Sequence, residues 1–178
     1  LIENCENKGA IVATVGRASG IAATLNSTTM MRYCNNRGNI TVDFVNGRIG
    51  ALTCIMGSRC SMDESYNHAD VITSDPQTTT AGMVALLNAT DVVVTDGGNY
   101  GKIIGANETY HGLLCANFSK FSKVDGCFAG GSCWTYSADG KHVQHEINAS
   151  NLYSHLGAQA TTNTSKIVNI GSPYGESG

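Results

Sequence analysis

The chain has 178 residues, of which 42% are hydrophobic, and this share is high enough for a buried core rather than a disordered chain. Charged residues make up only 14%, and the formal net charge is −3, so the composition offers no basic surface for nucleic acid. No apolar run approaches the length of a membrane-spanning helix.

The first half of the chain contains two predicted strand pairs. Ala10–Val15 and Ile21–Leu25 flank a glycine-containing loop, and Ile40–Val45 and Arg48–Cys54 flank Asn46-Gly47, a dipeptide typical of a two-residue hairpin turn. In that hairpin one face should be buried, and it comprises Val42, Phe44, Ile49 and Ala51.

A helix is predicted to follow these strands. Ser74 or Asp75 would cap it, Pro76 would occupy its first turn, and its apolar face would run through Ala81, Val84 and Leu87. Further predicted strands follow at Asp91–Thr95, Lys102–Ile104 and Gly112–Cys115.

The last third of the chain contains a second hairpin and a second helix. Asp139-Gly140 would join Cys133–Ala138 to Lys141–Ile147, with Tyr136 opposite Val143 and Trp134 opposite His145. The helix is predicted over residues 149–156 with Gly157 ending it, and a strand at Lys166–Ile170 follows.

These elements predict a single α+β domain over residues 1–178, with a mainly antiparallel sheet and two short helices. Cys54–Cys60 and Cys127–Cys133 share the pattern Cys-x2-Gly-x2-Cys. Either the chain is duplicated as two pseudo-symmetric halves, about 28–95 and 109–170, or this echo arises by chance in a chain rich in Gly and Cys.

Seven cysteines could form three disulfide bonds and leave one thiol to bridge to another chain. They are Cys5, Cys34, Cys54, Cys60, Cys115, Cys127 and Cys133. Their spacing does not choose among the pairings and does not match a structural zinc site. We therefore expect a disulfide-bonded protein; reduced thiols in a cytosolic protein are the alternative.

Seven Asn-x-Ser/Thr sequons accompany the cysteines. They begin at Asn26, Asn39, Asn88, Asn107, Asn117, Asn148 and Asn163. Such sites accept N-linked sugars in the secretory pathway. The chain also starts at Leu1 without a signal peptide, as a mature secreted product or a cloned fragment would. We expect a secreted, extracellular N-glycoprotein.

Several strings resemble catalytic or ligand-binding motifs but lack the required context. Gly131-Ser132-Cys133-Trp134 resembles the surroundings of a papain-type nucleophile, yet too little chain follows Cys133 for the partner His and Asn. His142, His145 and Glu146 reverse the zincin order, and His142 and His145 would point to opposite faces of a strand, with His145 beside Trp134. His155 could join one of these histidines, but no further metal ligand is apparent.

Two further kinds of site lack support in the sequence. Gly97–Gly101 lacks a Walker lysine and is better explained as a hairpin loop. The carboxylates Asp43, Asp63, Glu64 and Glu146 form no nominated pair. We expect no catalytic residue, no bound metal, no cofactor and no enzymatic activity.

Two segments resemble secreted fungal killer toxins and necrosis-inducing effectors of the α/β-sandwich type. They are Phe121–Phe128 with the helical segment Ile147–Leu156, and Asn39–Val45 after Asn36-Arg37-Gly38. The resemblance implies an antiparallel sheet with helices on one face and a non-enzymatic action on a target cell. The odd cysteine count departs from that family's pattern.

The sequence therefore predicts a protein that acts by binding a protein or a cell-surface target, as a killer toxin or effector does. The alternative is a structural subunit of an extracellular fibre, wall or coat that binds copies of itself. Low charge and strands of small residues such as Ile21–Leu25 suit such edge pairing. A hydrolase with no recognisable motif is a third alternative.

Overall fold

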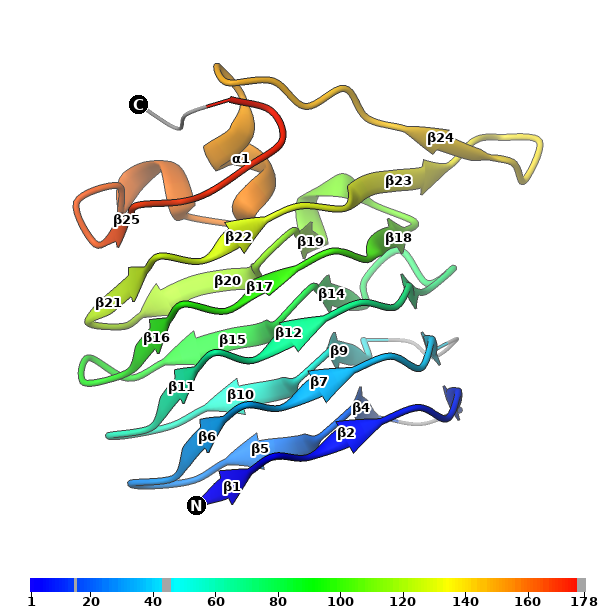
Figure 1. Cartoon of the computed structure of the whole chain (residues 1–178). Helices are drawn as coiled ribbons and strands as arrows, with labels where there is room; N and C mark the ends of the chain where they lie inside the picture. The colour runs from blue at the N-terminus through cyan, green and yellow to red at the C-terminus, as the bar shows by residue number, and fades with distance from the viewer. Residues whose placement is uncertain (15, 43–45, 176–178) are drawn as a thin grey trace.

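The computed structural model describes residues 1–14, 16–42 and 46–175, and it shows a parallel β-solenoid (Figure 1). The chain winds through four coils of five short strands each and then begins a fifth coil. The predicted α+β fold with an antiparallel sheet is therefore wrong, and so is the antiparallel arrangement implied by the toxin resemblance. Among the described residues the only antiparallel pair is β23 with β24.

Each coil contributes one strand to each of five sheets. The first coil contains β1 (Ile2–Glu3), β2 (Glu6–Asn7), β3 (Ile11–Ala13), β4 (Arg17–Ser19) and β5 (Ala22–Leu25). The second contains β6 (Met30–Arg32), β7 (Asn35–Asn36), β8 (Ile40–Val42), β9 (Arg48–Gly50) and β10 (Thr53–Met56). The third contains β11 (Ser61–Asp63), β12 (Tyr66–Asn67), β13 (Val71–Ile72), β14 (Thr79–Ala81) and β15 (Val84–Asn88).

The remaining elements complete the stack and close it. The fourth coil contains β16 (Val93–Thr95), β17 (Gly98–Asn99), β18 (Lys102–Gly105), the 3₁₀ helix η1 (Glu108–Tyr110), β19 (His111–Gly112) and β20 (Cys115–Lys120). Then come β21 (Lys123–Asp125), β22 (Phe128–Ala129), β23 (Ser132–Tyr136), β24 (His142–Gln144), α1 (Leu152–Leu156), η2 (Ala160–Thr162) and β25 (Ile167–Val168).

The coils stack in register with a repeat of about 30 residues. Met31 pairs with Met62, which pairs with Val94, which pairs with Val124, and all four side chains are at most 1% exposed. One inward position is thus apolar in coil after coil, and the stacked side chains form a continuous core. The observed repeat of about 30 residues is roughly half the length of the predicted duplicated segments 28–95 and 109–170.

A short motif recurs once per coil and explains the register. It reads x-Asn-x-Gly/Ala-x-Ile/Val, from Glu6, Asn35, Tyr66 and Gly98 onward. The four asparagines form a hydrogen-bonded ladder, in which Asn7 Nδ2 donates to Asn36 Oδ1 (2.8 Å), Asn36 Nδ2 to Asn67 Oδ1 (2.9 Å), and Asn67 Nδ2 to Asn99 Oδ1 (2.8 Å). Ala129 takes the next position and ends the ladder. A buried amide row of this kind fixes register because a slipped coil would leave amides unpaired.

The first predicted hairpin does not form. β8 pairs in parallel with β3 and β13, and β9 pairs with β4 and β14. Likewise, β3 and β5 lie in different sheets, so the predicted pair around residues 16–20 is also wrong. Val42, Ile49 and Ala51 are nevertheless fully buried, while Phe44 lies outside the described residues.

The predicted helix after Ser74 is wrong. Asp75 caps only a turn, in which its Oδ2 accepts from the Gln77 amide (3.1 Å) and from Thr78 Oγ1 (2.8 Å). β14 and β15 follow, with a bend between them at Gly82. The spacing that suggested a helix, with Ala81, Val84 and Leu87 facing inward, is produced here by two short strands that meet at an angle.

The predictions for the C-terminal third agree more closely with the structure. β23 and β24 form the expected hairpin around Asp139-Gly140, but Tyr136 pairs with His142 and Trp134 with Gln144, one residue from the predicted register. The second helix is present as α1 and ends at Gly157, and β25 lies within the predicted last strand.

Gly157 is predicted to tolerate no side chain. Its φ is +151°, and an added Cβ would lie 1.6 Å from the carbonyl oxygen of Cys115. We expect Gly157→Ala to lower the free energy of unfolding by about 3 kcal/mol, because clash and backbone strain add. The control is Gly140→Ala, where φ is +79° but no atom lies within 4 Å. Urea unfolding that gave both variants equal stabilities would contradict this.

Candidate functional site

The two ends of the solenoid differ. At the C-terminal end each of the five sheets meets a further segment: β25 pairs with β21, β24 pairs with β23, Ala158 bridges to Asn117 of β20, and Gly171 bridges to Phe128 of β22. Beside β19, the Leu113 amide donates to the carbonyl oxygen of His155 in α1 (2.8 Å). At the N-terminal end the five sheets stop at β1, β2, β3, β4 and β5, with no covering strand among the described residues.

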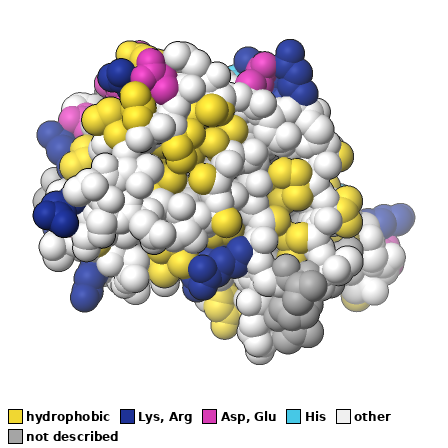
Figure 2. All heavy atoms as spheres, turned by 90° about the horizontal axis from the view of Figure 1, so that it is seen from below, with side chains coloured by type: hydrophobic (Ala, Val, Ile, Leu, Met, Phe, Trp, Pro, Cys, Tyr) yellow, Lys and Arg dark blue, Asp and Glu magenta, His cyan; other side chains and the backbone are white. Residues whose placement is uncertain are grey.

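The core is therefore open at the first coil, on a surface that we call the first-coil face. It is formed by the outer edges of β1–β5 together with the partly buried Ile2, Ile11, Ile21 and Ala22. The residues paired with Ile2 and Ile11 in the second coil, Met31 and Ile40, are fully buried. Figure 2 looks onto this end, and hydrophobic side chains gather on it while charged side chains lie mostly toward the margin.

Backbone amides of this face point away from the stack. Asn35, Tyr66, Gly98 and Phe128 occupy one position in successive coils, and each donates its amide to the preceding coil (2.8–3.1 Å). Glu6 occupies the same position in the first coil, and Lys8 matches Arg37, whose amide donates to the Asn7 carbonyl (2.8 Å). By this equivalence the Glu6 and Lys8 amides face outward, as in any unpaired edge strand.

Asn7 is the acceptor end of the ladder. In the coils above, each ladder Oδ1 accepts from the Nδ2 of the preceding coil. Asn7 Oδ1 accepts from the Gly9 amide (3.2 Å). The position from which the Nδ2 of a preceding coil would donate to Asn7 Oδ1 lies on the first-coil face. The ladder could therefore continue only from a coil that brings a carboxamide donor.

Charged side chains at the margin are paired within the stack. Glu3 binds Arg32 (3.0 Å), and Glu6 binds Arg37 (2.6 Å) and Lys8 (3.3 Å). The hydrogen bond from Arg37 lowers the pKa of Glu6. The pairs of Glu3 with Arg32 and of Glu6 with Arg37 join the first coil to the second, and all three pairs reduce the net charge that the face presents.

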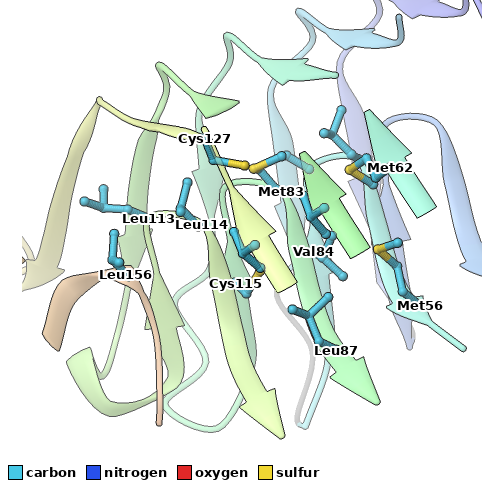
Figure 3. Packing of buried hydrophobic residues seen from close by; sticks show 14 of the residues in the cluster. Met56, Met62, Met83, Val84, Leu87, Leu113, Leu114, Cys115, Cys127 and Leu156 are labelled. Carbon is cyan, nitrogen blue, oxygen red and sulfur yellow. The ribbon is translucent and has the colours of Figure 1, made fainter. Parts of the chain in front are cut away.

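The predicted disulfide bonds are absent: no two of the seven cysteines, all of which lie in the described part, are at bonding distance. Cys5 is exposed, and the other six are buried as small apolar core residues, as Figure 3 shows for Cys115 and Cys127. Burial raises the pKa of Cys127 and of Cys133 to about 12, so these thiols stay protonated at neutral pH. The six buried thiols lie inside the stacked coils.

Most of the sequon asparagines are accessible. Asn26, Asn39, Asn88, Asn107 and Asn148 are exposed, and Asn117 and Asn163 are half-buried. The Oδ1 of Asn117 is buried without a hydrogen-bond partner. Sugar at the five exposed positions would meet no steric barrier, and glycosylation stays a prediction.

Three histidines meet where the C-terminal segment joins the stack. The ring of His145 lies 6.5 Å from that of His111 and 6.3 Å from that of His155, between ring centroids. Glu108 lies between His145 and His155, with oxygens 3.5 Å and 3.9 Å from their Nδ1 atoms. His142 is exposed and packs edge-on against Tyr136, away from this cluster.

The sequence named His145 and His155 but missed His111 and Glu108. His145 does not lie opposite Trp134, which pairs with Gln144. No three His, Cys, Asp or Glu side chains within residues 1–14, 16–42 and 46–175 are arranged to hold a metal ion. No motif marks His111 or Glu108. Glu108 begins η1 and His111 begins β19, and only the folded arrangement brings both side chains to the cluster.

The other predicted motif residues lie elsewhere. Gly97–Gly101 is not a hairpin loop, because Gly98 and Asn99 form β17 within the stack. Asp63 accepts a hydrogen bond from Thr95 (2.7 Å), and Asp43 lies outside the described residues. Cys133 is buried in β23.

Comparison of the chain with family models, with curated proteins and with solved structures finds no match. In the described part of the chain, the helices are too short to cross a bilayer.

Proposed function

We propose that this chain is part of a larger β-solenoid, a structural assembly in which a further coil covers the first-coil face. The partner is a solenoid coil that pairs its strands in parallel with β1–β5. This deepens the expectation of a structural subunit in an extracellular assembly; secretion itself remains a prediction.

One observation carries the proposal: the sheets are covered at the C-terminal end and uncovered at the first coil. Solenoids need capping at their ends, because an uncapped coil exposes apolar surface and unpaired strand edges. Partly exposed Ile2 and Ile11, directly beneath the fully buried Met31 and Ile40, support the docking of a further coil at this face.

The ladder specifies the partner's chemistry. A docked coil must supply an amide nitrogen donor to Asn7 Oδ1, as Asn7 itself supplies one to Asn36. The Glu6 and Lys8 amides additionally require backbone carbonyl acceptors. A coil with the motif x-Asn-x-Gly-x-Ile would meet both requirements.

The test is to graft one coil onto this face. A copy of residues 61–92, which carry Asn67, would be placed directly before Leu1, because Leu1 is equivalent to Ser61 and Val93 in the stack. We expect the graft to raise the free energy of unfolding by about 2 kcal/mol or more, through burial of Ile2 and Ile11 and new strand pairing.

The matched control replaces only the copied ladder asparagine with alanine. This graft should stabilise less, since Asn7 Oδ1 then gains no partner. A graft that left the stability of the original chain unchanged, or that unfolded independently of it, would contradict the proposal.

A further inference from the structure

Five structural elements bring polar side chains together beside the C-terminal cover. Glu108 lies in η1, His111 in β19, Thr135 in β23, His155 in α1, and His145 directly follows β24. The His145 amide donates to the Cys133 carbonyl (2.9 Å), which holds this residue against β23. The cluster lies at the opposite end of the stack from the first-coil face.

The His145 ring lies between the Thr135 hydroxyl and the Glu108 carboxylate. Thr135 Oγ1 lies 2.8 Å from His145 Nε2, and His145 Nδ1 lies 3.5 Å from Glu108 Oε2. With its carboxylate beside Nδ1, Glu108 favours the tautomer protonated at Nδ1, so Nε2 accepts the hydrogen bond from the Thr135 hydroxyl. A hydroxyl on a base that a third group orients is the arrangement of an activated nucleophile, and such contacts are often long before substrate binds.

His111 adds an uncharged imidazole behind His145. It is 5% exposed, and neither of its ring nitrogens has a hydrogen-bond partner in the structure. Burial, and then the neighbouring His145 and His155, lower its pKa to about 4. A neutral imidazole with an unused N–H can donate to a developing oxyanion without adding a charge.

An open cavity borders His145 and indicates the class of substrate. Its volume is about 350 Å³, and it is lined by Gln144, His145, Glu146, Ile147 and Tyr174. This is the lower end of the range for small-molecule sites. Ile147 and Tyr174 offer apolar surface, while Glu146 and the nearby Glu108 would repel an anion. The cavity thus suits a small, uncharged ester.

We propose that Thr135 is an acyl-accepting nucleophile, with His145 as its base and Glu108 as the group that orients the base. Thr135 Oγ attacks the ester carbonyl while its proton passes to His145 Nε2. The tetrahedral intermediate then expels the alcohol, which takes that proton, and leaves acyl-Thr135. Water, deprotonated by His145, releases the carboxylic acid and restores the hydroxyl. This activity lies beyond both the sequence expectation of no enzyme and the proposed structural function.

The test uses the full chain with p-nitrophenyl acetate at pH 8. We expect acetyl on Thr135, located by peptide mass spectrometry, and release of p-nitrophenolate on the order of 100-fold faster than from Thr135→Val. His145→Gln should abolish the acetyl-Thr135 peptide, and Glu108→Gln should slow its formation.

Thr95→Val is the matched control, because Thr95 hydrogen-bonds to Asp63, and both residues lie in a sheet that does not contain β23. In this variant, Thr135 should be acetylated to the same extent as in the wild type. Circular dichroism of each variant confirms that the fold is retained. Acetyl found only on lysines, acetyl-Thr135 unchanged in His145→Gln, or esterase activity retained in Thr135→Val would each overturn the proposal.

Discussion

Replacing Asn67 with alanine is expected to lower the free energy of unfolding by about 4 kcal/mol. Asn67 is fully buried, and its amide joins three coils. Nδ2 donates to Asn99 Oδ1 (2.8 Å) and the Ala69 carbonyl (2.9 Å), while Oδ1 accepts from Asn36 Nδ2 (2.9 Å). Alanine would leave each of these partners buried with an unmet hydrogen bond.

Urea unfolding at neutral pH measures the effect, and Asn7→Ala is the matched control. Asn7 belongs to the same ladder but lies on the first-coil face, where water can replace its hydrogen bonds. We expect the control to lose about 1 kcal/mol. Equal losses at both positions would show that the ladder is not buried as described.

The second large effect concerns His111 and acid. Its pKa is lowered to about 4 in the folded chain, mainly by burial, whereas an unfolded histidine titrates near 6.5. The unfolded chain therefore binds the proton more tightly, and the stability contributed by neutral His111 is complete above pH 6.5. It is lost as the pH falls toward 4, and the loss reaches about 3 kcal/mol. Burial also lowers the pKa of His155, which acts in the same direction.

The measurement compares wild type with His111→Phe by urea unfolding at pH 7 and pH 4. Phenylalanine cannot titrate, so the difference in unfolding free energy between the two proteins should change by about 3 kcal/mol in favour of the variant at pH 4. Because carboxylates titrate equally in both proteins, their contribution cancels. An unchanged difference would mean that His111 is not held neutral by its surroundings.

Local signals in the sequence predicted correct pairing only for elements whose hydrogen bonds are local. The hairpin at Asp139-Gly140 and the helix ended by Gly157 were found because turn and cap residues determine them. Asn46-Gly47 has the same turn signature, yet β8 and β9 pair with other coils. A turn dipeptide specifies a change of direction, and the partner strand is decided by which neighbour buries the apolar face.

The solenoid had a signal in the sequence, but at a longer period than any hairpin. Asn7, Asn36, Asn67 and Asn99, each followed at a fixed distance by Ile or Val, mark the coils. A search for repeats of about 30 residues would have found them. The weaker Cys-x2-Gly-x2-Cys echo drew attention instead, although Cys60 lies just before β11 and Cys133 lies within β23, which belongs to a different sheet.

The candidate sites could not be predicted from the sequence. Ile2 and Ile11 have the same residue type as buried core positions, and only the stacking order reveals that they lie on an open face. Glu108 lies in η1, His111 lies in β19, and His145 follows the β23–β24 hairpin. These elements come together only when the coils stack. Six of the seven cysteines are buried within the coils, and composition alone could not distinguish such buried thiols from disulfide partners.

Amide hydrogen exchange of the first coil tests the central claim most directly. In the chain alone the Glu6 and Lys8 amides should exchange rapidly, while the equivalent Asn35 and Arg37 amides, bonded to Cys5 and Asn7, should be protected. In the chain extended by residues 61–92, Glu6 and Lys8 should become protected like Asn35 and Arg37. Rapid exchange of Glu6 and Lys8 in the extended chain would contradict coil docking at the first-coil face.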